Sequence, residues 1–398
     1  MHRLSKEGRV TTGKKTSKGA RPGRPVSTGP KSRNPPPSVR VAVVDDSTFI
    51  RKAIIRMLED DPLIEVVGSA GSGEELLTHF ERWQPDVVTL DLDMPGMGGL
   101  ATLDRITALR PTPVIILSTH SGKGAPLTIE ALHRGATDFI DKQNYSLVDF
   151  EALRSVLVDK IFQVTGRSYP HAEDETDEEV LTTEEEHDVP SLDIPDVKIP
   201  CAYDLIAIGA STGGPPILQE ILESLGEAIQ IPVVVVQHMP VGFTHAFAER
   251  LNTYLPLQVR EAKPSEHLLP HTVYIAQAGT HLRIRRHEAE LYSELSPHPK
   301  DLIHVPSIDV LFESTARTVG RRAIGVLLTG MGRDGARGMA ALKLKGAYTF
   351  CQDEESCVVF GMPRAALALG AVTEVATPKE IGHRLRELVT GEPATQAP

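Results

Sequence analysis

Apolar residues gather in short runs that alternate with amphipathic stretches, and this alternation occupies two blocks of the chain, at about 39–160 and 201–391. In the first block, an apolar run at 39–44 precedes a stretch at 47–60 whose apolar residues repeat with helical spacing. The same alternation continues to the end of the block. Its predicted strands are the runs VRVAVV, IEVVGSA, PDVVTL, PVIILS and DFID.

The second block repeats this pattern. Its predicted strands are DLIAIGA, IPVVVVQ, HTVYIAQ, RAIGVLL and YTFCQ, and its predicted helices include 215–225, 244–255 and 378–390. Strands that alternate with helices favour a parallel sheet covered by helices on both faces. We therefore predict two doubly wound α/β domains, whose functional sites should lie where strands end and helices begin.

Two further segments lack the apolar residues that a folded core needs. The first 40 residues hold 11 Lys and Arg against one acid, and ten acids with no Lys or Arg stand between His171 and Asp188. Such segments cannot bury enough surface to offset their chain entropy, so we expect them to be disordered or extended. The predicted organisation is a basic tail at 1–38, a first domain at 39–157, an acidic linker at 158–200 and a second domain at 201–391.

Composition excludes several classes of protein. No apolar run approaches the roughly 18 residues of a membrane-spanning helix, and the N-terminus lacks the apolar core of a secretory signal. The three cysteines are too few and too scattered for a disulfide framework, and no CxxC pair suggests zinc. We therefore expect a cytoplasmic protein.

Acidic residues mark the strand ends of the first block. Asp45 and Asp46 follow one predicted strand and Asp91 another, while Ser118 and Lys142 close two more. Clustered carboxylates suit Mg²⁺, and a carboxylate beside Mg²⁺ can accept a phosphoryl group. Taken singly, each acid is better explained as a solvated loop residue. The coincidence of these residue types at successive strand ends favours a shared site.

The second block carries a candidate nucleophile. Ser211 lies in a Gly-rich turn between a strand and a helix, His238 follows the next strand, and Asp334 follows a third in another Gly-rich turn. A serine, a histidine base and a carboxylate that orients the base are the parts of a hydrolytic triad. On its own segment, Ser211 is better explained as a helix-capping residue. The turn GASTGG is neither GxGxxG nor GxSxG, which disfavours a dehydrogenase and an ordinary α/β-hydrolase.

The first block resembles the receiver domain of response regulators, through the segments DDS, LDLDMPGMGG, ILSTHSGKG and FIDK. The resemblance implies a flavodoxin-like fold and makes Asp91 the phospho-acceptor. It also implies that Mg²⁺ is held by Asp45, Asp46 and Asp91 together with the carbonyl of Asp93, and that Ser118 and Lys142 respond to phosphorylation. Two positions depart from the family pattern. Gly98 stands where Asp is usual, and Gln143 follows Lys142 where Pro is usual, which puts the cis peptide of that loop in question.

The second block resembles the catalytic domain of the CheB family of chemotaxis protein-glutamate methylesterases, through GASTGG, QHMP and LTGMGRDGA. The resemblance implies a Rossmann-like domain with Ser211 as nucleophile, His238 as base and Asp334 as the residue that orients it. The backbone N–H of Met331 is a candidate donor to the oxyanion. No cofactor is expected in this domain.

The family resemblance implies hydrolysis of glutamate γ-methyl esters on chemoreceptors, with release of methanol, and deamidation of receptor glutamines. A chemotaxis histidine kinase would phosphorylate Asp91, and the unphosphorylated receiver would cover the Ser211 pocket. The expected partners are therefore methyl-accepting receptors and a kinase, with peripheral membrane association only and no nucleic acid. Two alternatives are a phospho-dependent binding protein with an unused esterase site and, less favoured, a DNA-binding regulator with the basic tail as its contact.

Overall fold

The computed structural model describes residues 38–118, 124–142, 150–167, 203–227, 229–300 and 302–391. From Ser38 onward the chain forms one compact unit, which contains both predicted domains. The predicted basic tail, and the acidic linker beyond residue 167, lie outside the described residues, as does Gln143.

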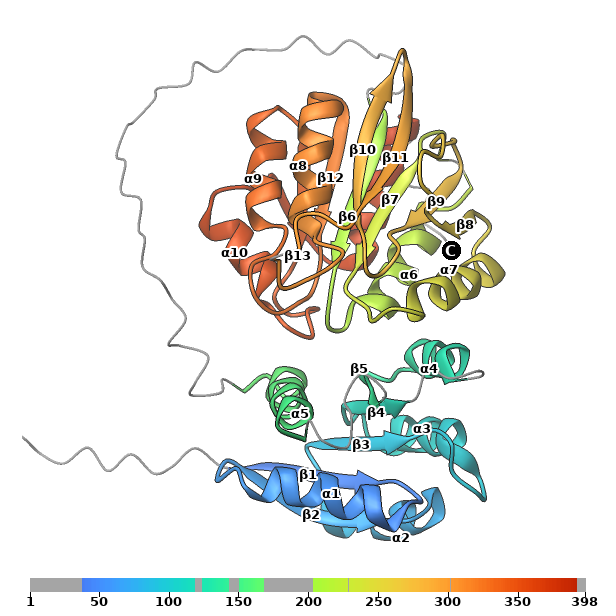
Figure 1. Ribbon diagram of the computed structural model, residues 1–398, viewed down its shortest axis with the longest axis vertical. Helices are drawn as coiled ribbons and strands as arrows, with labels where there is room; N and C mark the ends of the chain where they lie inside the picture. The colour runs from blue at the N-terminus through green and yellow to red at the C-terminus, as the bar shows by residue number, and fades with distance from the viewer. Residues whose placement is uncertain are drawn as a thin grey trace, which may run out of the picture. The chain divides into compact units, whose positions relative to one another are not determined.

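The first domain is a five-stranded parallel sheet in the order β2-β1-β3-β4-β5 (Figure 1). Its elements are β1 (Val39–Val44), α1 (Thr48–Glu59), β2 (Ile64–Ala70), α2 (Gly73–Trp83), β3 (Val87–Asp91), α3 (Gly98–Leu109), β4 (Val114–Ser118), α4 (Gly124–His133), β5 (Asp138–Asp141) and α5 (Phe150–Val164). The strand order reverses between β1 and β3. The loops that follow these two strands therefore diverge and leave a crevice at the carboxyl edge of the sheet.

Successive side chains of a strand point to opposite faces of the sheet, and in this sheet helices cover both faces. In β1, Val41 and Val43 pack with apolar residues of α1 and α5, whereas Ala42 and Val44 pack with residues of α2, α3 and α4. All four are fully buried. A strand buried on both faces reads as a continuous apolar run, as the sequence of β1 does.

The second domain is a seven-stranded parallel sheet in the order β14-β13-β12-β6-β7-β9-β8. Its strands are β6 (Leu205–Ala210), β7 (Val233–Gln237), β8 (Gln258–Glu261), β9 (Thr272–Ile275), β12 (Ala323–Leu327), β13 (Tyr348–Gln352) and β14 (Glu374–Ala376). Its helices are α6 (Gly214–Leu225), α7 (Phe243–Tyr254), α8 (Ile308–Thr318), α9 (Ala336–Leu344), α10 (Met362–Ala368) and α11 (Pro378–Thr390), with a 3-10 turn at Gly320–Arg322. One face packs against α6, α7 and α11 and the other against α8, α9 and α10.

The prediction of two parallel-sheet α/β domains is thus confirmed. The strands β8 and β14, at the two edges of the larger sheet, were not predicted, because four-residue and three-residue edge strands carry little apolar pattern. An antiparallel hairpin, β10 (His281–His287) with β11 (Glu290–Ser296), stands apart from the main sheet.

Helix α5 runs beyond the predicted end of the first domain. It continues to Val164, whereas the linker was expected to begin at residue 158. The physical reason is burial, because Ile161 and Phe162 are 0% and 4% exposed within the core of the first domain. The predicted boundary at 157 therefore falls inside a packed helix.

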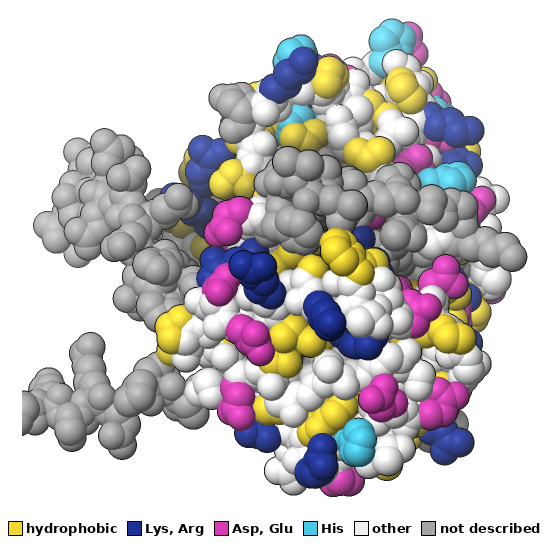
Figure 2. Space-filling view, turned by 60° about the horizontal axis from the view of Figure 1, so that its bottom comes forward, with side chains coloured by type: hydrophobic (Ala, Val, Ile, Leu, Met, Phe, Trp, Pro, Cys, Tyr) yellow, Lys and Arg dark blue, Asp and Glu magenta, His cyan; other side chains and the backbone are white. Residues whose placement is uncertain are grey.

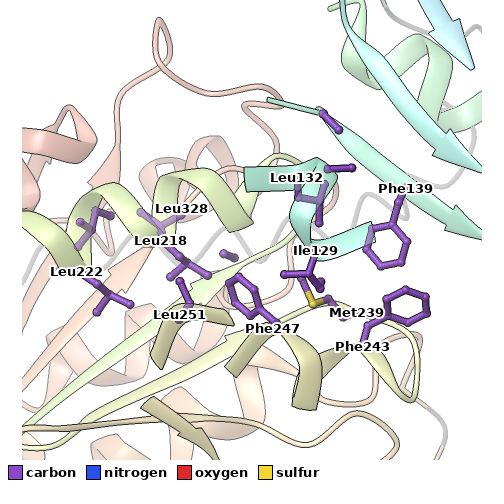
Figure 3. Packing of buried hydrophobic residues seen from close by; sticks show 14 of the residues in the cluster. Ile129, Leu132, Phe139, Leu218, Leu222, Met239, Phe243, Phe247, Leu251 and Leu328 are labelled. Carbon is purple, nitrogen blue, oxygen red and sulfur yellow. The ribbon is translucent and has the colours of Figure 1, made fainter. Parts of the chain in front are cut away.

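The two domains share a continuous apolar cluster. Ile129 and Leu132 of α4 belong to the same cluster as Phe247 of α7, and the rings of Phe139 and Phe243 lie 4.6 Å apart (Figure 3). We call this contact of α4 and β5 with α6 and α7 the interdomain interface. Apolar burial of this kind holds two domains together more firmly than a polar contact of the same area.

Polar side chains border the interdomain interface. Glu130 of α4 and Arg250 of α7 form an ion pair of 2.5 Å, and Nδ1 of His133 lies 2.7 Å from Oε1 of Gln219 in α6. On the face of the molecule shown in Figure 2, acidic and basic side chains are interspersed. The acidic excess of the sequence is therefore not gathered into one patch on that face.

Trp83, the single tryptophan, provides a probe of packing in the first domain. A Cβ atom on Gly68 of β2 would lie 2.2 Å from the indole ring, so we expect Gly68→Ala to lower the free energy of unfolding of this domain by about 1–3 kcal/mol. Urea unfolding followed by Trp83 fluorescence measures the change. Gly71→Ala is the matched control, because its nearest neighbour would be 3.5 Å away. Equal midpoints for the two variants would contradict this account.

Candidate active site and receiver site

Ser211 lies directly after β6, in the turn that leads into α6. Two positions of this turn require glycine, one because of its backbone conformation and the other because a side chain would clash. Gly213 has a φ of 76°, and a Cβ on Gly214 would lie 2.2 Å from Oε1 of Gln237. The backbone carbonyl of Ser211 accepts from the N–H of Gly214 at 2.8 Å and from Nε2 of Gln237 at 2.8 Å. The nucleophile candidate thus stands on a rigid turn.

Parallel pairing of β6 with β7 brings His238 to Ser211. Ala210 is in register with Gln237, and the N–H of His238 donates to the carbonyl of Ala210 at 3.0 Å. Nδ1 of the imidazole lies 3.1 Å from Oγ of Ser211. Ser211 and His238, the residues that directly follow β6 and β7, therefore lie side by side at the carboxyl edge of the sheet.

Asp334 completes the group. Nε2 of His238 lies 2.9 Å from its Oδ2, on the side of the ring opposite Ser211. An ionised carboxylate only accepts hydrogen bonds, so Nε2 carries the proton and Nδ1 is left as an acceptor for the Ser211 hydroxyl. The structure thus brings together the three residues that the sequence singled out.

The carboxylate of Asp334 is anchored at the N-terminus of α8. It accepts hydrogen bonds from the backbone N–H groups of Ile308 at 2.8 Å and Asp309 at 2.9 Å, and from the Ser307 hydroxyl at 2.9 Å. Burial alone would raise the pKa of Asp334. The hydrogen bond and charge of His238 and the two backbone N–H groups outweigh burial and hold this pKa well below its ordinary range. Asp334 is therefore an anion at every physiological pH.

His304 is a residue of this site that the sequence analysis missed. Its ring stacks on that of His238, with centroids 4.0 Å apart and an interplanar angle of 16°. Burial, and then the neighbouring His238, lower the pKa of His304 to about 4, so its ring is neutral at neutral pH. The flat neutral ring covers one face of the imidazole. A histidine three residues before the helix cap Ser307 was the only signal available in the sequence.

Gly330 and Met331 pass beside the serine. A Cβ on Gly330 would lie 2.6 Å from the Cβ of Ser211, so only glycine fits there. The Met331 side chain that follows is 42% exposed. Its backbone N–H follows a residue that packs closely against Ser211, and its role as an oxyanion donor stays a prediction.

The predicted acidic site of the first domain is also assembled. Carboxylate oxygens of Asp45, Asp46 and Asp91 lie within 4.8 Å of one another. Nζ of Lys142 lies 3.0 Å from Oδ2 of Asp91 and 3.3 Å from Oδ2 of Asp45. Burial raises the pKa of Asp45, and the charge of Asp91 adds to this, while Lys142 opposes it. This is a donor set of oxygen atoms, which suits Mg²⁺.

Two further predicted residues border the acidic site. The N–H of Asp93 donates to Oδ1 of Asp91 at 3.3 Å, and the Asp93 side chain is exposed. Ser118, at the end of β4, is buried and accepts a hydrogen bond from Thr128 of α4. Leu117, the residue before it, is in register with Asp91 of β3, so Ser118 lies at the same edge of the sheet as the acidic site and also contacts α4.

Comparison with known proteins identifies the family. The family model for the CheB methylesterase matches residues 206–385, and that for the response regulator receiver domain matches residues 41–154. The chain is 38% identical over 368 residues to a protein-glutamate methylesterase/protein-glutamine glutaminase of Oleidesulfovibrio alaskensis, covering 88% of this chain and 99% of that protein. The chain belongs to the CheB family.

Other relatives agree with this membership. A protein-glutamate methylesterase/protein-glutamine glutaminase of Pectobacterium atrosepticum is 39% identical over 348 residues, which cover 87% of this chain and 96% of that protein. The crystal structure of the Thermotoga maritima CheB methylesterase catalytic domain is 37% identical, with a TM-score of 0.46, and covers 47% of this chain and 99% of that chain. From the two family-model matches, we call the domain that contains residues 41–154 the receiver domain and the domain that contains residues 206–385 the methylesterase domain, in an enzyme of the CheB family.

Membership of the CheB family implies a kinase as phosphodonor for the receiver domain and receptors as substrates of the methylesterase domain. No helix among the described residues has the length and apolar character needed to cross a bilayer.

Cysteine is excluded as a rival nucleophile in the described part of this CheB-family chain. Cys351 is buried and Cys357 is half-buried, and burial raises the pKa of each thiol to about 12. Only about one thiol in 10⁴ is then ionised at pH 8, and the thiolate is the reactive form.

We therefore expect iodoacetamide at pH 8 to leave Cys351 and Cys357 unmodified in the folded chain, as measured by peptide mass spectrometry. The same treatment in guanidinium is the control and should alkylate both. Rapid modification of either thiol in the folded chain would contradict the pKa assignment.

Proposed function

We propose that this enzyme hydrolyses glutamate γ-methyl esters on chemoreceptors, releasing methanol, and deamidates receptor glutamines, with Ser211 as its nucleophile. The observation that carries the proposal is the two-sided contact of His238, with Ser211 at 3.1 Å and Asp334 at 2.9 Å. A base that is fixed by a carboxylate on one side and meets a hydroxyl on the other is suited to nucleophilic catalysis.

The reaction follows from this geometry. Oγ of Ser211 attacks the side-chain carbonyl carbon of the substrate while Nδ1 of His238 takes the hydroxyl proton. The charge that develops on His238 is stabilised by Asp334, which remains ionised. The backbone N–H of Met331 donates to the oxyanion of the tetrahedral intermediate.

His238 then returns its proton to the leaving group, so the ester releases methanol and the amide releases ammonia. The acyl-enzyme is hydrolysed by a water molecule that His238 deprotonates in the same way, which regenerates Ser211 and leaves a glutamate. Esters and amides share one intermediate, and a single site therefore serves both substrates.

Replacing Ser211 by Ala tests the nucleophile. We expect methanol release from methylated receptor membranes to fall by about 10⁴-fold or more, because alanine has no hydroxyl with which to form the acyl-enzyme. Asp91 phosphorylation by a small-molecule phosphodonor is the control and should be unchanged. Methanol release at the unaltered rate would refute the assignment. A protein that only docks on receptors or kinases would release no methanol in any form.

The receiver domain is proposed to control this activity through phosphorylation of Asp91. The carboxylates of Asp45, Asp46 and Asp91, with the carbonyl of Asp93, would hold Mg²⁺, and the short separations within this oxygen set support that assignment. When bound, the ion neutralises charge on the transferring phosphoryl group. Lys142 already contacts Asp91 and would hold a phosphoryl oxygen.

Phosphorylation can reach the interdomain interface through Ser118. Its hydroxyl accepts from Thr128 of α4, and α4 also carries Ile129 and Leu132 into the apolar cluster shared with α7. If Ser118 turns to the phosphoryl group, it gives up Thr128, and α4 loses one of the contacts that hold its position. We propose that this weakens the interdomain interface and opens the Ser211 site to a receptor.

A phosphodonor with Mg²⁺ should accordingly raise methanol release by about 5- to 150-fold, the usual range of such couplings. Asp91→Asn keeps the shape of the residue but cannot be phosphorylated, and it should not respond. EDTA should abolish the response of the wild type without lowering its basal rate. Equal stimulation of the wild type and Asp91→Asn would overturn the role of Asp91.

A further inference from the structure

Gln163 belongs to helix α5 of the receiver domain, but its side chain contacts the candidate active site of the methylesterase domain. Leu157, Ile161 and Phe162 of this helix point into the receiver core and are 0%, 0% and 4% exposed. Gln163 is only half-buried and belongs to no part of that core. Its position is therefore set by contacts with the other domain.

Both ends of the Gln163 carboxamide are held beside the nucleophile. Its Oε1 accepts a hydrogen bond of 3.2 Å from Oγ1 of Thr212, the residue that follows Ser211. Its Nε2 contacts Sδ of Met331. Met331 follows Gly330, whose backbone runs directly against Ser211. The amide thus lies between the two segments that flank the serine.

A second contact ties α5 to the same turn. Val358, in the loop after β13, packs against the apolar cluster that α5 forms with the receiver sheet. The same side chain lies 2.5 Å from the point where a Cβ on Gly213 would stand, in the turn that carries Ser211. Helix α5 therefore lies close to this turn through apolar packing as well as through Gln163.

The group held there has the chemistry of a substrate. A glutaminase of proteins acts on the carboxamide of glutamine, and a glutamate methyl ester has the same carbonyl with OCH₃ in place of NH₂. On the proposed function, the substrate residues are carried on receptor helices, and Gln163 is carried on a helix of 15 residues. The receiver domain thus places a glutamine carboxamide, carried on a helix, beside the Ser211 site.

We propose that Gln163 is an internal substrate mimic, which competes with receptor glutamates and glutamines for a subsite formed by the Thr212 hydroxyl and the Met331 thioether. The proposal rests on the proposed function of the Ser211 site. In that subsite, Thr212 donates to the substrate carbonyl oxygen and Met331 faces the leaving group. A mimic on the same chain has a high effective concentration, so one hydrogen-bonded side chain is enough to compete.

Competition between Gln163 and a receptor side chain for one subsite predicts a specific change in kinetics. A purely structural role of Gln163 would not produce that change. A receptor side chain must displace Gln163, which raises the KM of the unphosphorylated enzyme and leaves kcat unchanged. Loss of the hydrogen bond between Thr212 and Gln163, if it has ordinary strength, corresponds to a change in KM of about threefold to tenfold. The mimic also depends on the polar atoms of the Gln163 carboxamide. If Gln163 only blocked the subsite by its volume, an apolar side chain of similar size would act equally well.

The test is methanol release from methylated receptor membranes by the full chain, as a function of receptor concentration, with and without a phosphodonor. The variants are Gln163→Ala, which removes the group, and Gln163→Met, which fills similar space without an acceptor for Thr212. Ser155→Ala, at an exposed position of the same helix, is the matched control.

We expect both Gln163 variants to lower KM by about threefold to tenfold in the unphosphorylated form, with kcat unchanged and with little change in the phosphorylated form. Ser155→Ala should match the wild type. A Gln163→Met enzyme with the KM of the wild type would overturn the mimic in favour of steric plugging. An unaltered KM in Gln163→Ala would overturn both, because that variant removes the bulk as well as the carboxamide. Absence of methanol release even from the phosphorylated wild type would instead refute the proposed function, and the mimic with it.

Discussion

The carboxylate of Asp334 is the point at which the methylesterase domain is organised. It accepts the first backbone N–H groups of α8, the hydroxyl of Ser307 and the Nε2 proton of His238. These four donors consume the hydrogen-bonding capacity of both oxygens, so the carboxylate has one orientation. Because the helix N-terminus carries a partial positive charge, the anion is stable despite its burial. The tautomer of His238, and with it the acceptor that meets Ser211, follows from this single anchored charge.

The parallel sheet supplies the second constraint. All neighbouring strands of a parallel sheet end at the same edge, so residues that follow β6, β7 and β12 converge although they are far apart in the chain. Ser211, His238 and Asp334 follow these three strands. In the receiver domain the same rule brings Asp45 and Asp91 together after β1 and β3, beside Lys142. One architecture thus assembles the Ser211, His238 and Asp334 group in one domain and a carboxylate cluster in the other.

Two helices of the receiver domain, α4 and α5, contact the methylesterase domain. Thr128 of α4 donates to Ser118 at the end of β4, and Ile129 and Leu132 of the same helix pack in one cluster with residues of α7. Helix α5 brings Gln163 to the residues next to Ser211. Under the proposed regulation, a change at the acidic site would act on the domain whose Gln163 lies beside Ser211.

From the sequence alone, both α/β domains and the residues Ser211, His238, Asp334, Asp45, Asp46 and Asp91 could be predicted, because buried parallel strands and Gly-rich turns leave a local pattern at each strand end. The extent of α5, the edge strands β8 and β14, the His304 ring on His238 and the contacts of Gln163 could not. Each depends on surfaces that meet only after the chain has folded. Helix α5 extends through Ile161 and Phe162 because these side chains are buried in the receiver core. Nothing in the local sequence distinguishes Gln163 from other polar residues, and its role follows from the contact with Thr212. Local periodicity determines where the elements and their end residues lie, whereas contacts between elements distant in the chain are decided by packing, which no local pattern records.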